Sequence, residues 1–103
     1  MMKIDAVFQR AKTGHIFVFS GENYYRLNPK VPGLIEPGYP KPIAGNWPGV
    51  NFKRIDVAFQ RSDTGKVFLF SGQEYIRFDL EGADAAEPGF PKPIPANWAD
   101  IFA

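Results

Sequence analysis

The chain of 103 residues contains the same segment twice. The stretch Ile4–Arg10 (IDAVFQR) returns as Ile55–Arg61 (IDVAFQR), and the register holds without a gap to Asn46-Trp47 and Asn97-Trp98. The period is therefore about 51 residues, and the two copies nearly fill the chain. A repeat of this length is one supersecondary unit, and repeat architectures usually need about three units to be stable alone. We therefore expect the chain to work within a larger assembly.

Composition excludes several classes of protein. Hydrophobic residues make up 45% of the chain and aromatic residues 16%, which is too apolar for a disordered segment. The net charge of +1 is spread over both copies and leaves no basic stripe, so we expect neither a nucleic-acid nor a membrane partner. No segment resembles a signal peptide, which favours a cytoplasmic location. The lack of cysteine excludes disulfides and thiolate metal sites but fixes no compartment.

Each copy is predicted to form a meander of three antiparallel strands. In the first copy we expect strands at 4–9, 16–19 and 24–28, and the second copy repeats this pattern. Gly14 can adopt the positive φ that the first hairpin needs, and Ser20-Gly21-Glu22-Asn23 is typical of the second turn. The middle strand is a continuous apolar run, which predicts that both of its faces are covered.

Each copy ends in a proline-rich segment followed by an Asn-Trp pair. The prolines of 36–43 and 87–94 exclude a central strand, so these segments are predicted to be turns with at most a short edge strand. Asn46-Trp47 is expected to start a short helical turn whose Trp packs under the sheet. No long segment has a helical period, which favours small twisted sheets stacked face to face, as in a β-propeller. We assign one blade to residues 1–52 and one to 53–103.

Together these motifs resemble the hemopexin repeat. The matching segments are IDAVF at 4–8, FVFSG at 17–21, YYRLN at 24–28, and GYPKPI with NWPG within 38–49. The resemblance implies an all-β fold, a four-bladed propeller with one repeat per blade. Two repeats make half of such a ring and leave two apolar faces open, more than a soluble monomer usually tolerates. We expect a C2 homodimer to complete the propeller.

The resemblance also implies an ion in the central channel. In this family the main-chain carbonyls of the motif Asp, and of the residue two positions later, bind calcium or sodium, sometimes with chloride nearby. By position these are the metal-site residues Asp5, Val7, Asp56 and Ala58. Carbonyl oxygens are hard ligands that suit calcium. The alternative is that the two Asp side chains only hydrogen-bond neighbouring strand ends.

The remaining polar residues suggest binding rather than chemistry. His15 is the only histidine and is expected to be a solvated turn residue. Because hemopexin itself ligates haem through histidines, we expect no haem here. Arg77 is expected to form an ion pair with Asp79. Four basic residues that recur in both copies are candidate partner contacts: Lys41, Lys92, Arg26 and Arg77.

These observations predict a protein that is not an enzyme. No nucleophile with its base, phosphate-binding loop or metal cluster can be assembled around one histidine. The first hypothesis is a binding or scaffold module that homodimerises, holds an ion and recognises protein partners through its rims. A second is a carrier of a small cationic ligand, such as a polyamine, in a channel lined by Asp5 and Asp56. A third is an excised or designed half-propeller used to study assembly from duplicated repeats.

Overall fold

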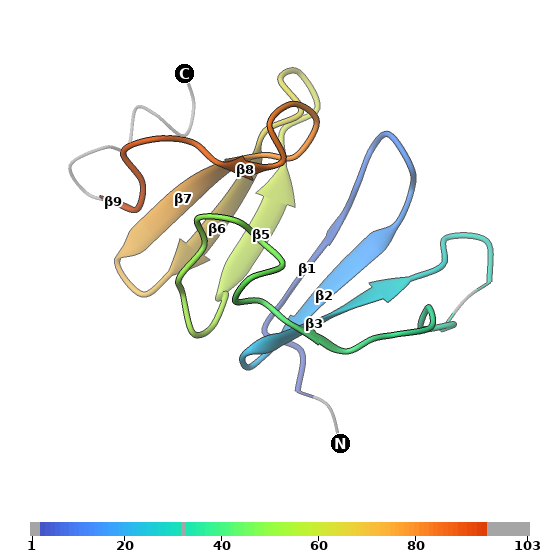
Figure 1. Ribbon diagram of the computed structural model, residues 1–103. Coiled ribbons are helices and arrows are strands. Elements are labelled where there is room, and N and C mark those ends of the chain that lie inside the picture. Colours follow the sequence, from blue (N-terminus) through green and yellow to red (C-terminus); the bar gives the residue numbers. More distant parts are fainter. Residues whose placement is uncertain (1–2, 32, 95–103) are drawn as a thin grey trace.

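The computed structural model describes residues 3–31 and 33–94, and it folds these into two sheets, one for each repeat (Figure 1). The first sheet has the order β1-β2-β3-β4, with β1 (Ala6–Gln9), β2 (Ile16–Ser20), β3 (Asn23–Leu27) and β4 (Lys41–Pro42). The second comprises β5 (Val57–Gln60), β6 (Val67–Ser71), β7 (Glu74–Asp79), β8 (Ala85–Ala86) and β9 (Lys92–Pro93), with β8 and β9 both paired to β7. The described residues form no helix, and so none that could cross a membrane. The all-β prediction is confirmed.

The predicted meander is confirmed in both repeats. Val18 lies opposite Tyr25 in the first sheet and Leu69 lies opposite Ile76 in the second, so the strand registers match when shifted by one period. Gly14 has a φ of 79°, in the left-handed region that the first hairpin requires. The short strands β4 and β9 lie at the outer edges, where the lack of a proline N–H is tolerated.

The segment after β4 forms a short turn, as expected, and does not extend into a helix. The N–H groups of Asn46 and Trp47 both donate to the carbonyl of Ile43 at 3.2 Å, and the N–H of Val50 donates to the carbonyl of Trp47 at 2.9 Å. Asn46 does not cap this turn, because its side-chain amide donates backwards to the carbonyl of Pro42 at 2.8 Å. Trp47 is buried, as predicted.

The two blades stack face to face through unlike surfaces. One side of each blade carries phenyl and phenol rings, and we call it the aromatic face: Phe8, Phe17, Phe19 and Tyr24 in blade 1, and Phe59, Phe68, Phe70 and Tyr75 in blade 2. The other side is mainly aliphatic, and we call it the aliphatic face: Ile55, Ala58, Val67, Leu69, Ile76 and Phe78 in blade 2. The aromatic face of blade 1 packs on the aliphatic face of blade 2 in one buried core, the inner seam.

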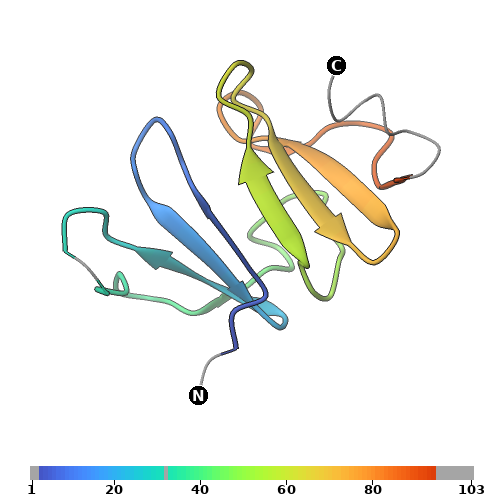
Figure 2. The same ribbon diagram turned by 180° about the vertical axis from the view of Figure 1, so that it is seen from behind.

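The indole of Trp47 fills the centre of the inner seam. Its ring centroid lies 5.4 Å from that of Phe19 in blade 1 and 4.9 Å from that of Phe78 in blade 2. The chain also closes the seam through its backbone, because the N–H of Ala86 donates to the carbonyl of Pro48 at 2.8 Å. Strands β1 and β5 consequently lie side by side, as both views show (Figure 2). The corresponding Trp98 lies outside the described residues.

Candidate functional site

Each blade carries a stack of two cations around one aromatic ring. In blade 1 the guanidinium of Arg26 lies 5.3 Å from the centre of the Tyr39 ring, and the ammonium of Lys41 lies 4.8 Å from it. Blade 2 repeats the stack with Arg77, Phe90 and Lys92, at 5.4 Å and 4.7 Å. Cation–π contact holds these side chains in place at the outer strands. The four predicted partner contacts therefore lie in two equivalent positions, one on each blade.

The arginines of these stacks pair with glutamates of the proline-rich segments. Arg26 pairs with Glu36, and the Arg77 Nη2 lies 2.8 Å from the Glu87 Oε1. The expected pairing of Arg77 with Asp79 is wrong, because Asp79 instead contacts Lys66 at 3.3 Å. The physical reason is the path of the chain after β7, which brings Glu87 back to Arg77. The N–H of Glu87 donates to the carbonyl of Arg77, and this places the Glu87 side chain beside the guanidinium.

His15 is more constrained than a solvated turn residue. Its Nε2 lies 3.2 Å from the Glu36 Oε2, and its Nδ1 lies 2.9 Å from the Thr13 hydroxyl. In blade 2, Lys66 takes this place and lies 3.0 Å from the Glu87 Oε2. In both blades this position therefore carries a basic side chain next to the Oε2 of the glutamate, and its role is structural.

The side chains of Asp5 and Asp56 close the hairpins between the second and third strands. The Gly21 N–H donates to the Asp5 carboxylate at 2.8 Å, and the Gly72 N–H donates to the Asp56 carboxylate at 2.7 Å. The bond from Gly72, supplemented by Arg54, holds the pKa of Asp56 below its ordinary value. The described residues contain no group of three or more metal-ligating side chains. The ion site that the family resemblance implies uses main-chain carbonyls, those of Asp5, Val7, Asp56 and Ala58, and not side chains.

Polar contacts join the blades at one corner of the inner seam. Arg10, which follows β1, donates to the Glu81 carboxylate through Nε at 2.9 Å and through Nη2 at 2.8 Å. Gln60 of blade 2 accepts a bond from the Ala11 N–H at 2.8 Å and donates to Glu81 at 3.0 Å. Bidentate pairing of this kind fixes orientation as well as adding energy. These contacts align blade 2 on blade 1.

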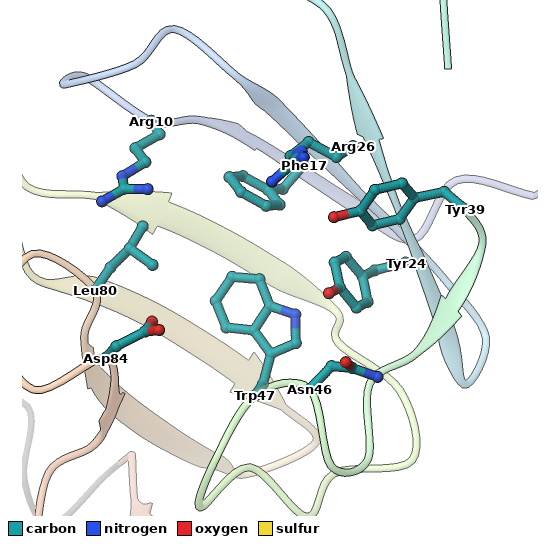
Figure 3. A pocket seen from close by; sticks show the side chains of 9 residues that line it. All are labelled: Arg10, Phe17, Tyr24, Arg26, Tyr39, Asn46, Trp47, Leu80 and Asp84. Atoms are coloured by element: carbon teal, nitrogen blue, oxygen red, sulfur yellow. The ribbon is translucent and has the colours of Figure 1, made fainter. Parts of the chain in front are cut away.

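A pocket of about 160 Å³ opens beside these contacts (Figure 3). Its wall combines Arg10, Tyr24 and Trp47 of blade 1 with Leu80 and Asp84, which follow β7 in blade 2. Burial, followed by the neighbouring Tyr39, raises the pKa of Tyr24 to about 12. The buried Trp47 Nε1 has no hydrogen-bond partner among the described residues. The pocket is thus lined by aromatic rings together with the charged groups of Arg10, Arg26 and Asp84.

The sequence analysis did not identify the seam residues. Gln9 and Gln60, and Arg10 and Arg61, recur in the quoted motif, which could have marked them as residues with a repeated task. Glu81 gave no such signal, because it lies in the stretch where the two copies differ. Only the relative placement of the sheets brings it to Arg10.

Comparison with known proteins identifies the repeat. The profile of the hemopexin family matches residues 4–51 and 55–101. Porcine (Sus scrofa) vitronectin is 38% identical over 95 residues, which cover 91% of this chain and 19% of vitronectin. Human neutrophil collagenase is 40% identical over 75 residues, covering 73% of this chain and 15% of the collagenase. The chain thus spans less than a quarter of the length of these relatives.

Solved structures agree with this match. The hemopexin-fold protein CP4 from cow pea has a TM-score of 0.73 and 27% identity, over 97% of this chain and 46% of that one. A Cicer arietinum plant lectin described as having two metal-binding sites has a TM-score of 0.74 and 27% identity, over 93% of this chain and 44% of the lectin. The repeated motif, the paired sheets and these similarities together show that the chain belongs to the hemopexin family.

Proposed function

We propose that the chain is a non-enzymatic binding module, half of a four-bladed propeller that two copies complete. The proposal rests on the family, on the two blades of the chain and on the state of its outward faces. In the ring, the aromatic face of blade 2 packs on the aliphatic face of blade 1 of the partner. This outer seam repeats the geometry of the inner seam, so the two subunits are related by a twofold axis.

The observation that carries the proposal is a difference in burial between equivalent residues. On the aliphatic face of blade 1, Ile4 is 56% exposed and Val7 is 44% exposed. Their counterparts one period later, Ile55 and Ala58, are 0% and 8% exposed because blade 1 covers them. Ile16, Tyr25 and Leu27 are likewise half-buried where Val67, Ile76 and Phe78 are buried. Blade 1 therefore presents a surface built like one that is known to receive a blade.

The aromatic face of blade 2 shows the same difference. Val57 is 52% exposed, whereas its counterpart Ala6 is buried in the inner seam. Phe59 and Phe70 are partly buried, whereas Phe8 and Phe19 are buried beneath blade 2. Phe68 and Tyr75 of the same face are buried, so the part that lacks the cover its counterpart receives is the part with Val57, Phe59 and Phe70.

A charge placed on the aliphatic face of blade 1 tests the proposal. Val7→Glu would bring a carboxylate into each outer seam, where burying an unpaired charge is costly. We expect the wild type to elute as a dimer in multi-angle light scattering and Val7→Glu as a folded monomer. Val31→Glu is the matched control, because Val31 is similarly exposed at 48% but its counterpart Gly82 is exposed as well. A monomeric wild type, or a control that dissociates equally, would contradict the proposal.

We further propose that the completed ring binds calcium or sodium, with chloride as a second candidate, through the carbonyls of Asp5, Val7, Asp56 and Ala58. Strands β1 and β5 lie side by side, and the ring would bring four such strands to its axis. The similarity to a lectin with metal-binding sites supports the proposal. Native mass spectrometry with and without a chelator tests it. We expect an ion on the dimer that the chelator removes, and an ion-free dimer in calcium solution would contradict the proposal.

The cation stacks are the proposed contacts for a protein partner. A dimer would present Lys41 and Lys92 twice each, and their fixed positions favour a multivalent contact with an acidic surface. Binding of the dimer to immobilised polyglutamate provides a probe. We expect Lys41→Ala with Lys92→Ala to weaken retention, whereas Lys3→Ala, at an exposed position outside the stacks, retains it. Equal loss in both proteins would contradict this role.

A further inference from the structure

We infer that Trp98 is the central contact between the two subunits of the proposed dimer. The residue belongs to the C-terminal segment 95–103, which lies over the aromatic face of blade 2 and presents the indole to Leu27 of the partner subunit. The inference rests on the proposed dimer and adds the residue on which its outer seam depends. It gives Trp98 at the outer seam the task that Trp47 has at the inner seam.

The inner seam shows what such a tryptophan does. The Trp47 ring centroid lies 5.6 Å from that of Phe17 and 5.7 Å from that of Tyr24 in its own blade, with interplanar angles of 81° (Figure 3). Across the seam it lies 4.9 Å from the ring of Phe78 in blade 2. A buried indole that touches both sides of an interface is the kind of side chain that dominates its binding energy.

The chain leaves the two blades at equivalent points. The N–H of Ile43 donates to the carbonyl of Glu22 at 2.9 Å, and the N–H of Ile94 donates to the carbonyl of Gln73 at the same distance. The strands before these residues also match, because β4 pairs with β3 as β9 pairs with β7. The C-terminal segment therefore starts from the place on blade 2 that corresponds to the start of the Trp47 segment on blade 1.

The sequence of the C-terminal segment repeats that of the Trp47 segment. Trp98 follows Ile94 by four positions, as Trp47 follows Ile43, and an asparagine precedes the tryptophan in both copies. The family profile matches the second repeat as far as residue 101, so the segment is part of the repeat. The same spacing from the same starting point brings the indole of Trp98 over the rings of blade 2.

Two rings of blade 2 are already buried where this indole would lie. Phe68 is 1% exposed and Tyr75 is 0% exposed, although they belong to the outward aromatic face of blade 2. They are the counterparts of Phe17 and Tyr24, the two rings that stand perpendicular to Trp47. An indole placed on blade 2 as Trp47 is placed on blade 1 covers this pair within its own chain.

The opposite wall of the outer seam is open on blade 1. Leu27 is half-buried, whereas its counterpart Phe78, which meets Trp47 across the inner seam, is 1% exposed. Pro29 is exposed, whereas its counterpart Leu80 is 9% exposed. A second copy placed as the inner seam prescribes would bring its indole to these two positions and cover them.

Two substitutions in the same segment test the inference. Trp98→Ala removes the indole from both outer seams, so we expect the dimer dissociation constant to rise at least about 100-fold. Phe102→Ala is the matched control, because it removes a ring of the same segment whose counterpart Asn51 is exposed. We expect its dissociation constant to stay within about threefold of the wild type. Multi-angle light scattering over a dilution series measures both, and circular dichroism checks the fold.

Tryptophan fluorescence gives a second measurement, which does not require Trp98→Ala to fold. In Trp47→Phe the inner seam keeps an aromatic ring and Trp98 is the remaining tryptophan. We expect its emission to shift to longer wavelength, and its quenching by acrylamide to increase, as the dimer dissociates on dilution. An unchanged emission while light scattering reports dissociation would overturn the inference.

The outcomes separate this inference from the proposed dimer. A dimeric wild type, with a folded Trp98→Ala that dimerises equally well, would overturn the inference and leave the dimer standing. The partner subunit would then cover Val57 and Phe59 without help from the indole. A wild type that is monomeric at all concentrations would overturn both.

Discussion

At the scale of single residues, Trp47 makes the most concentrated contact between the blades. Its indole is 4% exposed and touches aromatic rings of both blades, including Phe19 and Phe78. Trp47→Ala should lower the free energy of unfolding by about 3–5 kcal/mol, because it removes the contacts and leaves a cavity. Urea denaturation at a fixed chain concentration measures this change. Val31→Ala, in an exposed loop, should change it by less than about 0.5 kcal/mol, and a similar loss in both variants would contradict the role of Trp47.

Tyr24 should make the stability of the fold decrease in alkali. Its pKa is raised to about 12, first by burial and then by Tyr39. Since an unfolded tyrosine titrates near 10, this contribution is complete below about pH 10 and is lost as the pH rises towards 12. Tyr24→Phe should therefore lose less stability than the wild type between these pH values in thermal melts. Identical curves for Tyr24→Phe and the wild type would exclude the effect.

Residue-level predictions from the sequence succeeded where the cause was local. The positive φ of Gly14 and the burial of Trp47 follow from turn chemistry and from side-chain size, and both are observed. The partner of Arg77 was missed because Glu87 follows a stretch that differs between the copies, and its approach depends on the path of that loop. The candidate partner contacts could be chosen by recurrence, but their stacking on Tyr39 and Phe90 needed the fold.

At the scale of elements, the hairpin between β6 and β7 depends on one carboxylate. The Gly72 N–H donates to Asp56, and this bond, with the contribution of Arg54, lowers the Asp56 pKa. A lowered pKa stabilises the fold above the ordinary value of 3.8, and this stability is lost as the pH falls through the folded-state pKa. Asp56→Asn should therefore show a shallower loss of stability in acid than the wild type. Acid titration followed by circular dichroism measures the slope, and an unchanged slope would contradict the assignment.

At the same hairpin, the role of the Asp56 side chain can be tested separately from that of its main-chain carbonyl. Asp56→Ala removes the acceptor for Gly72 and should cost about 0.5–1.5 kcal/mol of stability. If the ion binds carbonyl oxygens, its affinity should change by less than about threefold. Calcium titration by calorimetry checks this expectation, and loss of binding in a folded Asp56→Ala dimer would assign the carboxylate to the ion instead.

Strand positions were predictable because each blade is built from local hairpins. Short apolar runs, glycines at the turns and prolines at the edges specify β1 to β4 and their repeats without long-range information. The inner seam was less predictable: the sequence indicated stacked sheets, but the pairing of Arg10 with Glu81 joins residues 71 positions apart. Such contacts depend on how the twisted sheets are oriented, which a single sequence does not specify.

At the scale of the whole molecule, the account depends on the two open faces. Each resembles one side of the inner seam in composition and exposes residues whose counterparts are buried there. A twofold ring would cover both faces at once. The ion and the partner contacts would then be properties of the completed propeller, since a single chain supplies half of each set.

The mass of the protein in solution tests this claim most directly. Sedimentation equilibrium over a range of micromolar concentrations should fit a species of twice the 11.6 kDa chain mass, with no larger assemblies as the concentration rises. The closed ring predicts this upper limit because it leaves no face uncovered. A species of 11.6 kDa throughout, or a mass that keeps growing with concentration, would contradict the account.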